Sequence, residues 1–152
     1  MEPNNVSERF SKQVLQLLKE AGWFEGRNIV ISEDAQVNLQ PFAAAVSVLS
    51  EFGGLHIGHC GAGIECATSD VEIDPALTTH LSPDLREYER TWNTKLFALG
   101  DFQHSHGYLI IDSDGKAYLM NDTLDYFAVS FDQALEKLLL GLLPDVAKTP
   151  AL

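Results

Sequence analysis

The 152-residue sequence is 45% hydrophobic and carries 22 acidic against 10 basic side chains, a formal net charge of −12 at pH 7. This apolar content is enough to build a core, which excludes an acidic disordered tail, and the length predicts a single domain over residues 1–152. The negative surface that results would repel nucleic acid and anionic lipid, and would speed association with a basic partner.

The first predicted element is a helix that begins with Ser7 as its N-cap and ends at Gly22. Its buried stripe recurs at helical spacing and consists of Phe10, Val14, Leu17 and Leu18. Trp23 and Phe24 follow the end of the helix, and we expect both rings to fold back on this stripe.

A short strand is predicted at residues 28–31, followed by a second helix. Pro41 suits the first position of that helix, which runs over residues 42–52 and ends at Gly53 and Gly54. Because it carries so few charges, we expect it to be sandwiched between other elements.

The middle of the chain changes to short extended pieces separated by glycines, which predict strands at residues 55–57, 64–68 and 71–73. Ser82 followed by a proline and an acid then predicts a helix that runs to about Asn93.

The last third predicts a strand at residues 96–99 and a hairpin that joins strands 108–112 and 117–120 through residues 113–115. A final helix is capped by Ser130 or Asp132 and ends at Gly141. Helices that flank a central block of strands indicate an α+β fold with a single antiparallel sheet.

Cys60 and Cys66 are the only cysteines, and residues 1–11 lack the basic and then apolar character of an export signal. No run approaches the roughly 18 apolar residues of a membrane span. We therefore expect a soluble, cytoplasmic protein with reduced thiols.

Several short blocks of the chain match a known family in the same order. They are Ala21-Gly22-Trp23, Gly26-Arg27, Glu51-Phe52-Gly53-Gly54-Leu55, Ile73-Asp74-Pro75, Leu96-Phe97-Ala98-Leu99-Gly100, residues 111–118 and residues 130–136. This ordered set resembles the SUKH superfamily of bacterial immunity proteins, and its third immunity subgroup most closely, over about residues 8–142.

The resemblance implies an antiparallel sheet covered by helices, in a cytoplasmic protein that binds and neutralises a cognate polymorphic toxin, often a nuclease or nucleic-acid deaminase. It implies no catalytic residues. The chain departs from the family pattern at Ala128, where a glycine is usual, and in the glycine-rich segment 58–63, which could be specific to this protein's partner.

Four residues form the best case for a chemical site: His56, His59, Cys60 and Cys66. Their spacing is irregular for zinc, and a loop with Cys66 pointing inward is the simpler interpretation. A Cys60–histidine nucleophilic pair would need a base in reach, yet adjacent residues of an extended segment point to opposite faces. His104 and His106 are expected in an exposed loop that a toxin could contact.

Two other patterns imitate known binding motifs. Residues 112–115 begin like a calcium loop, but Lys116 and Thr123 stand where later ligands would be needed, so a hairpin turn is favoured. Residues 61–63 are only a fragment of a dinucleotide-binding fingerprint. We expect no enzyme activity, no metal and no cofactor.

A toxin that handles nucleic acid has a basic cleft, because phosphate charge dominates such binding. Its inhibitor would need clustered acids with aromatic anchors, although each acid could also be ordinary solvated surface. Two stretches qualify as partner-binding: Glu65, Asp70, Glu72 and Asp74 in the first, and Asp122, Asp125, Tyr126 and Asp132 in the second.

The leading hypothesis is therefore an immunity protein that binds a basic toxin domain stoichiometrically and is steered to it by charge. An alternative is a regulatory or scaffold adaptor of the same fold, which would have a non-toxic partner. A metal-dependent enzyme built on the histidines and cysteines of residues 56–66 is the third hypothesis.

Overall fold

The computed structural model describes residues 9–31 and 39–145, and its centre is one antiparallel sheet of six strands. The strands are β1 (His56–Ile57), β2 (Val71–Glu72), β3 (Leu96–Phe102), β4 (Gly107–Asp112), β5 (Ala117–Met120) and β6 (Leu124–Ala128). They lie side by side in chain order, so every neighbouring pair is antiparallel. The predicted α+β class with a single antiparallel sheet is confirmed.

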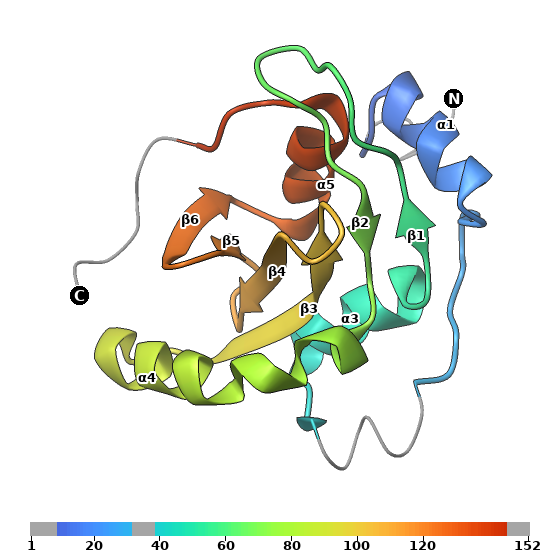
Figure 1. Cartoon of the computed structure of the whole chain (residues 1–152). Helices are drawn as coiled ribbons and strands as arrows, with labels where there is room; N and C mark the ends of the chain where they lie inside the picture. The colour runs from blue at the N-terminus through green and yellow to red at the C-terminus, as the bar shows by residue number, and fades with distance from the viewer. Residues whose placement is uncertain (1–8, 32–38, 146–152) are drawn as a thin grey trace.

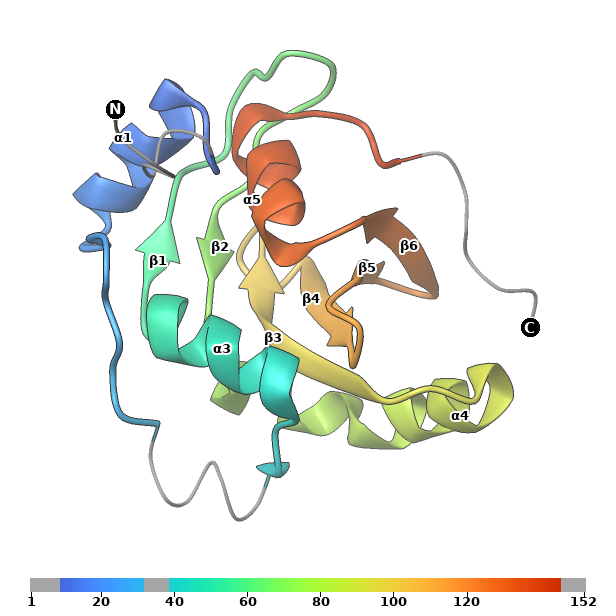
Figure 2. The ribbon, with the colours of Figure 1, turned by 180° about the vertical axis from the view of Figure 1, so that it is seen from behind.

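Helices lie on both faces of this sheet. They are α1 (Lys12–Glu20), α3 (Ala43–Phe52), the 3-10 helix η2 (Pro75–Leu81), α4 (Ser82–Trp92) and α5 (Phe131–Leu140). Figure 2 shows α1, α3 and α5 in front of one face, which we call the inner face, whereas α4 runs along the other side in Figure 1. Among the described residues, no helix is both long and apolar enough to cross a membrane.

The larger core fills the space between the inner face and its three helices. Phe52 of α3 lies at its centre, with its ring 4.9 Å from that of Phe131 and 6.4 Å from that of Phe10. Val14 and Leu18 of α1 are fully buried in the same cluster. Burial of this apolar surface is the main force that holds the helices to the sheet.

A smaller core lies on the outer face of the sheet. Leu81 and Leu85, at the junction of η2 and α4, pack there in one cluster with Met120 and Leu124 of β5 and β6. Apolar residues of β3 and β4 belong to the cluster as well, including Ile110. The small core includes no residue of β1 or β2, so these two strands at the edge of the outer face lie beyond it.

The first helix begins later than predicted. Its N-cap is Ser11, whose hydroxyl accepts a hydrogen bond from the backbone N–H of Val14, whereas Ser7 lies outside the described residues. Trp23 does fold back and is buried, but Phe24 is 59% exposed, so that half of the prediction is wrong.

Two predicted strands are also wrong. Residues 28–31 form no strand, and the N–H of Ile29 donates instead to the carbonyl of Ser50 in α3. Residues 64–68 form a loop whose N–H groups at Ile64 and Glu65 donate to the last carbonyls of α5. In both places the backbone finds its partners in a distant helix, which local sequence cannot reveal.

Other boundaries shift because tertiary pairing extends or shortens an element. Phe42 is the N-cap of α3, so Pro41 precedes the helix rather than starting it. The strand expected at 96–99 continues to Phe102, and β6 was not predicted at all. The hairpin is confirmed, and so is the last helix, which is capped by Ser130.

Candidate functional site

One row of paired residues crosses the whole sheet on its outer face. Its members, from β1 to β6, are His56, Glu72, Asp101, Tyr108, Met120 and Leu124. Directly paired residues of an antiparallel sheet project to the same side, so these six side chains share one face. The last two belong to the small core under α4 and Tyr108 packs against the edge of that core, whereas the first four form the polar half of the row.

We call this polar half, together with Asp70 and His104 beside it, the open face. Asp70 lies two residues before Glu72 along the chain and so points to the same side of the sheet. The open face is bounded on one side by η2, where the ring of His80 packs edge-on against Tyr108 at 5.1 Å between centroids.

Asp70 is the buried centre of the open face. Its side chain is only 6% exposed, yet three titratable groups from other segments surround it. His56 Nε2 lies 2.6 Å from Oδ2, His104 Nδ1 lies 3.5 Å from Oδ2, and Cys60 Sγ lies 3.5 Å from Oδ1. The carboxylate therefore has partners on both of its oxygens.

The electrostatics of this cluster favour an ion pair between the Asp70 carboxylate and the protonated ring of His56. Burial alone would raise the pKa of Asp70, but the hydrogen bonds from His56 and Cys60 and the nearby His104 outweigh it, so the pKa of this carboxyl lies below its usual value. The hydrogen bond to Asp70 raises the pKa of His56 against the opposing effect of burial, and the charges of Glu72 and Asp101 raise it further.

The turn between β3 and β4 places His104 over Asp70. Three consecutive residues there, Gln103, His104 and Ser105, have positive φ angles of 51°, 53° and 70°. The N–H of Gln103 donates to the carbonyl of Asp70, and the hydroxyl of Ser105 donates to Asp101 at 2.6 Å. Such a run of left-handed non-glycine residues is costly and persists only where surrounding contacts hold it.

The first predicted acidic stretch is only partly brought together. Asp70 and Glu72 share the open face, with Asp70 buried and Glu72 half-buried. Asp74 accepts a hydrogen bond from the N–H of Ala76 and so caps η2. Glu65 lies in the loop beside the end of α5, where its carboxylate accepts from the N–H of Leu143.

The second predicted stretch divides between both faces of the molecule. Asp122 and Asp125 are exposed at the β5–β6 turn. Tyr126 is 6% exposed, its ring is 5.9 Å from that of Tyr118, and burial raises its pKa. Three strands separate β6 from β2, so Glu72 of the first stretch is about 19 Å across the sheet from Asp125 and Tyr126 of the second, and these residues do not form one surface.

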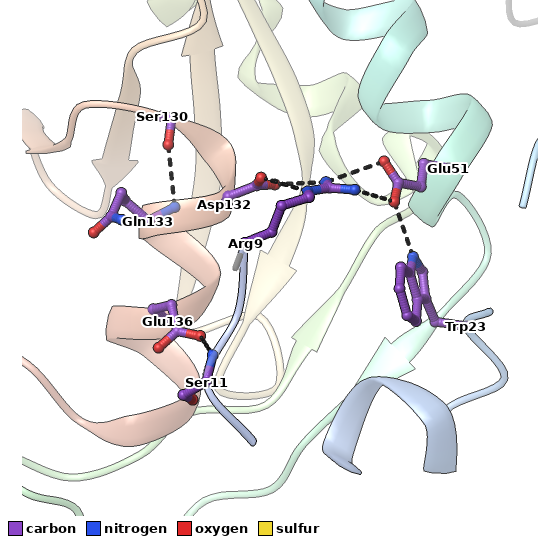
Figure 3. A network of polar contacts seen from close by, with 8 residues as sticks. All are labelled: Arg9, Ser11, Trp23, Glu51, Ser130, Asp132, Gln133 and Glu136. Carbon is purple, nitrogen blue, oxygen red and sulfur yellow. Dashed lines mark hydrogen bonds and ion pairs between the residues drawn. The ribbon is translucent and has the colours of Figure 1, made fainter. Parts of the chain in front are cut away.

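Asp132, the last member of that stretch, is part of a polar network on the α1–α3–α5 side (Figure 3). Arg9 lies between two carboxylates, with Nε 2.9 Å from Asp132 and Nη1 2.9 Å from Glu51. Glu51 also accepts from the indole N–H of Trp23. Asp132 therefore has a structural role. Through Arg9, the network joins the start of the described chain to α3 and α5.

The fold brings together only two of the four residues predicted as a chemical site. Of its four members, His56 and Cys60 meet at Asp70, while His59 and Cys66 are exposed and outside this cluster. The sequence did not connect His104 or Asp101 with them. The missing signal is the register of β2 against β3, which brings residues thirty positions apart together.

Two neighbouring features of the fold are not part of this cluster. Asp112 accepts from the N–H groups of Asp114 and Lys116, so the calcium-like segment is a hairpin turn, as predicted.

A groove of about 710 Å³ lies between η2, α4 and β3, and the residues that line it include Arg86, Arg90 and Lys95. None of the eight predicted acidic or aromatic positions lines it, and its basic residues are unsuited to a basic partner.

Comparison with known proteins gives one match. A family model described as SUKH-3 immunity protein matches residues 10–141. The matched range includes all the helices and strands named above, from α1 to α5. No curated protein and no solved structure gives a significant match.

Proposed function

Because this chain belongs to the SUKH-3 immunity protein family, we propose that it protects the cell that makes it by binding and neutralising a cognate polymorphic toxin. The partner is a protein, and the chain acts by occupying the toxin, with no chemical turnover of its own. The observation that carries this proposal is the family match over residues 10–141, and the charge of the chain supports it.

The toxin domain that this chemistry fits is basic, as in a nuclease or a nucleic-acid deaminase. Such enzymes need positive charge around the active site to hold phosphates. A protein with a formal net charge of −12 is attracted to that charge over a distance of about a Debye length, which raises the association rate.

The open face is the contact surface that we propose. It combines an uncovered part of the sheet with half-buried Glu72 and Tyr108 and exposed His56 and His104. Aromatic and charged side chains in a partly desolvated patch are typical of residues that dominate binding energy. Asp70 supports this patch from below, since its carboxylate is buried.

The other predicted acids have different roles in this proposal. Exposed Asp122 and Asp125, and Glu65 in its loop, add to the long-range attraction. Tyr126, Asp74 and Asp132 contribute through the fold that they stabilise, because each is buried or held by a contact within the chain.

Co-expression tests the proposal. The toxin is to be sought in the neighbouring gene, as the variable carboxy-terminal domain of a large secreted protein. We expect the chain to restore growth of cells that express this domain and to co-purify with it. Failure to protect at high expression, or a partner without toxic activity, would contradict the proposal and favour the adaptor alternative.

Three matched charge reversals then locate the surface. Glu72→Lys, Asp122→Lys and Glu25→Lys each change the formal net charge from −12 to −10. A like charge at the centre of the open face should weaken binding by about 100-fold or more, mostly through faster dissociation. Asp122→Lys should slow association by only a few-fold, and Glu25→Lys, which lies beyond the end of α1, should behave similarly or more mildly. If Glu72→Lys binds as well as Glu25→Lys, the open face is not the contact surface.

A further inference from the structure

We propose that Cys60, Asp70 and His104 bind a divalent transition metal ion, with Zn²⁺ as the best fit. One ligand atom from each of these side chains lies within 4.8 Å of the other two. They come from three separate parts of the chain: the loop after β1, the residue just before β2 and the β3–β4 turn. The site shares His104 with the proposed contact surface, but its test needs no toxin.

The distances approach those of a tetrahedral site. With metal–ligand bonds of about 2.0–2.3 Å, two ligand atoms of a tetrahedron are roughly 3.3–3.5 Å apart. Cys60 Sγ lies 3.5 Å from Oδ1 of Asp70, which fits this separation, and His104 Nδ1 lies 3.5 Å from the other carboxylate oxygen, Oδ2. Both belong to exposed loop residues, so only small side-chain movements are needed to close around an ion.

The ligand types select the metal. A thiolate, an imidazole and a carboxylate together suit Zn²⁺ much better than Mg²⁺ or Ca²⁺, which prefer oxygen ligands alone. Three protein ligands leave a fourth position for water. A structural zinc site normally has a fourth side chain in that position, so the proposed site differs from a structural one in being open to water.

His56 completes the site as a positioning residue. Its Nε2 lies 2.6 Å from Oδ2 of Asp70, which holds the carboxylate and leaves Oδ1, the oxygen that Cys60 faces, as the metal ligand. Ligands of metal ions are usually oriented by a second hydrogen-bonding group of this kind.

The surroundings favour a cation. Three carboxylates, of Asp70, Glu72 and Asp101, lie close to His56 and His104 on the open face. In the buried environment of Asp70 this excess of negative charge is costly, and a divalent ion offsets it. The turn at residues 103–105, which places His104 here, has a strained backbone with three positive φ angles. Strain of this kind is often found at functional positions.

Metal titration of the purified chain under reducing conditions tests the site. We expect one Zn²⁺ per chain by calorimetry and elemental analysis. Cobalt(II) should produce the intense visible bands of tetrahedral geometry together with a near-ultraviolet thiolate-to-cobalt band. Failure to bind either ion, or a cobalt spectrum without the thiolate band, would overturn the proposal.

Matched variants identify the ligands. Cys60→Ser should remove the thiolate band, and Cys60→Ser and His104→Ala should each lower zinc affinity by about 100-fold or more, while His56→Ala should lower it by about 10-fold. Cys66→Ser and His59→Ala are the controls, since both residues belong to the same loop but lie outside the cluster. Equal losses in the controls and the ligand variants would refute this site. Circular dichroism separates loss of a ligand from loss of the fold.

Discussion

Tyr118 shows how one buried residue couples the fold to pH. Its hydroxyl donates to Asp112 at 2.9 Å, and the side chain is 6% exposed. Burial raises the pKa of Tyr118, and the carboxylate of Asp112 raises it further. The folded state therefore keeps this proton at a pH where the unfolded chain has already lost it.

The sign of the effect follows from where each state titrates. Below about pH 10, the usual tyrosine pKa, Tyr118 is protonated in both the folded and the unfolded state, and its hydrogen bond to Asp112 contributes fully to stability. Above it, only the unfolded state releases the proton until the folded pKa is reached, so the free energy of unfolding falls as pH rises. We predict that Tyr118→Phe reduces this slope in denaturant titrations between about pH 9 and pH 11.5. The same slope in both proteins would contradict the prediction.

Arg9 carries a second prediction. It binds Asp132 and Glu51 together, and its removal would leave these two carboxylates without their shared cation. We expect Arg9→Ala to lower the free energy of unfolding by about 1 kcal/mol, less at high salt. Arg90→Ala is the matched control, because its ion pair with Glu87 is exposed on α4, and it should have a smaller effect. Equal effects would mean that the network in Figure 3 stabilises the fold no more than an exposed ion pair does.

Single residues also show the limits of sequence interpretation. Asp70 and Glu65 were predicted from the same acidic stretch, yet one is buried among histidines and the other is exposed in a loop. The difference depends on the β3–β4 turn, whose residues Gln103 and His104 contact Asp70 from more than thirty positions further along the chain. The ends of the last helix, in contrast, were predicted closely: Ser130, one of the two predicted N-cap candidates, caps it, and Gly141 ends it, because a cap acts on backbone groups only a few residues away.

Among the elements, the loop at residues 58–68 depends on contact with α5. The N–H groups of Ile64, Glu65 and Cys66 donate to the carbonyls of Leu140 and Gly141. The loop thus provides partners for the last carbonyls of the helix. Its glycine-rich part, residues 58–63, holds Cys60.

Two glycines of this loop make a matched test. A Cβ on Gly63 would collide with the carbonyl oxygen of Cys66 and approach that of Leu140, whereas a Cβ on Gly61 has only the Thr68 hydroxyl nearby at 3.8 Å. We predict that Gly63→Ala lowers the free energy of unfolding by about 2 kcal/mol and that Gly61→Ala is nearly neutral. Denaturant unfolding of both variants measures this. A neutral Gly63→Ala would show that the loop does not pack on α5 as described.

Elements were predicted well where their signals are local. The hairpin of β4 and β5 is marked by its turn residues, and α4 by its proline and acid in the first turn. The wrong strands at 28–31 and 64–68 are extended segments whose hydrogen bonds go to helices, so β-propensity alone misassigned them. The strand β6 was missed because its residues do not alternate between polar and apolar: its last three residues are all buried.

At the scale of the whole molecule, the sequence predicted the fold class and the family correctly, since both depend on ordered patterns along the chain. It could not assemble the open face, because this surface results from pairing across β1 to β4 and from incomplete cover by α4. The predicted acids therefore lie on several surfaces rather than on one.

The central claim is that this chain inhibits by occupying its toxin. Titrating the purified toxin domain with the chain, while following the toxin's own catalytic activity, tests this most directly. At toxin concentrations far above the dissociation constant, we predict that residual activity falls linearly to zero at one equivalent of chain. Loss of toxin activity at a small fraction of an equivalent would mean that the chain acts catalytically, and full activity at excess would mean that it does not neutralise this toxin.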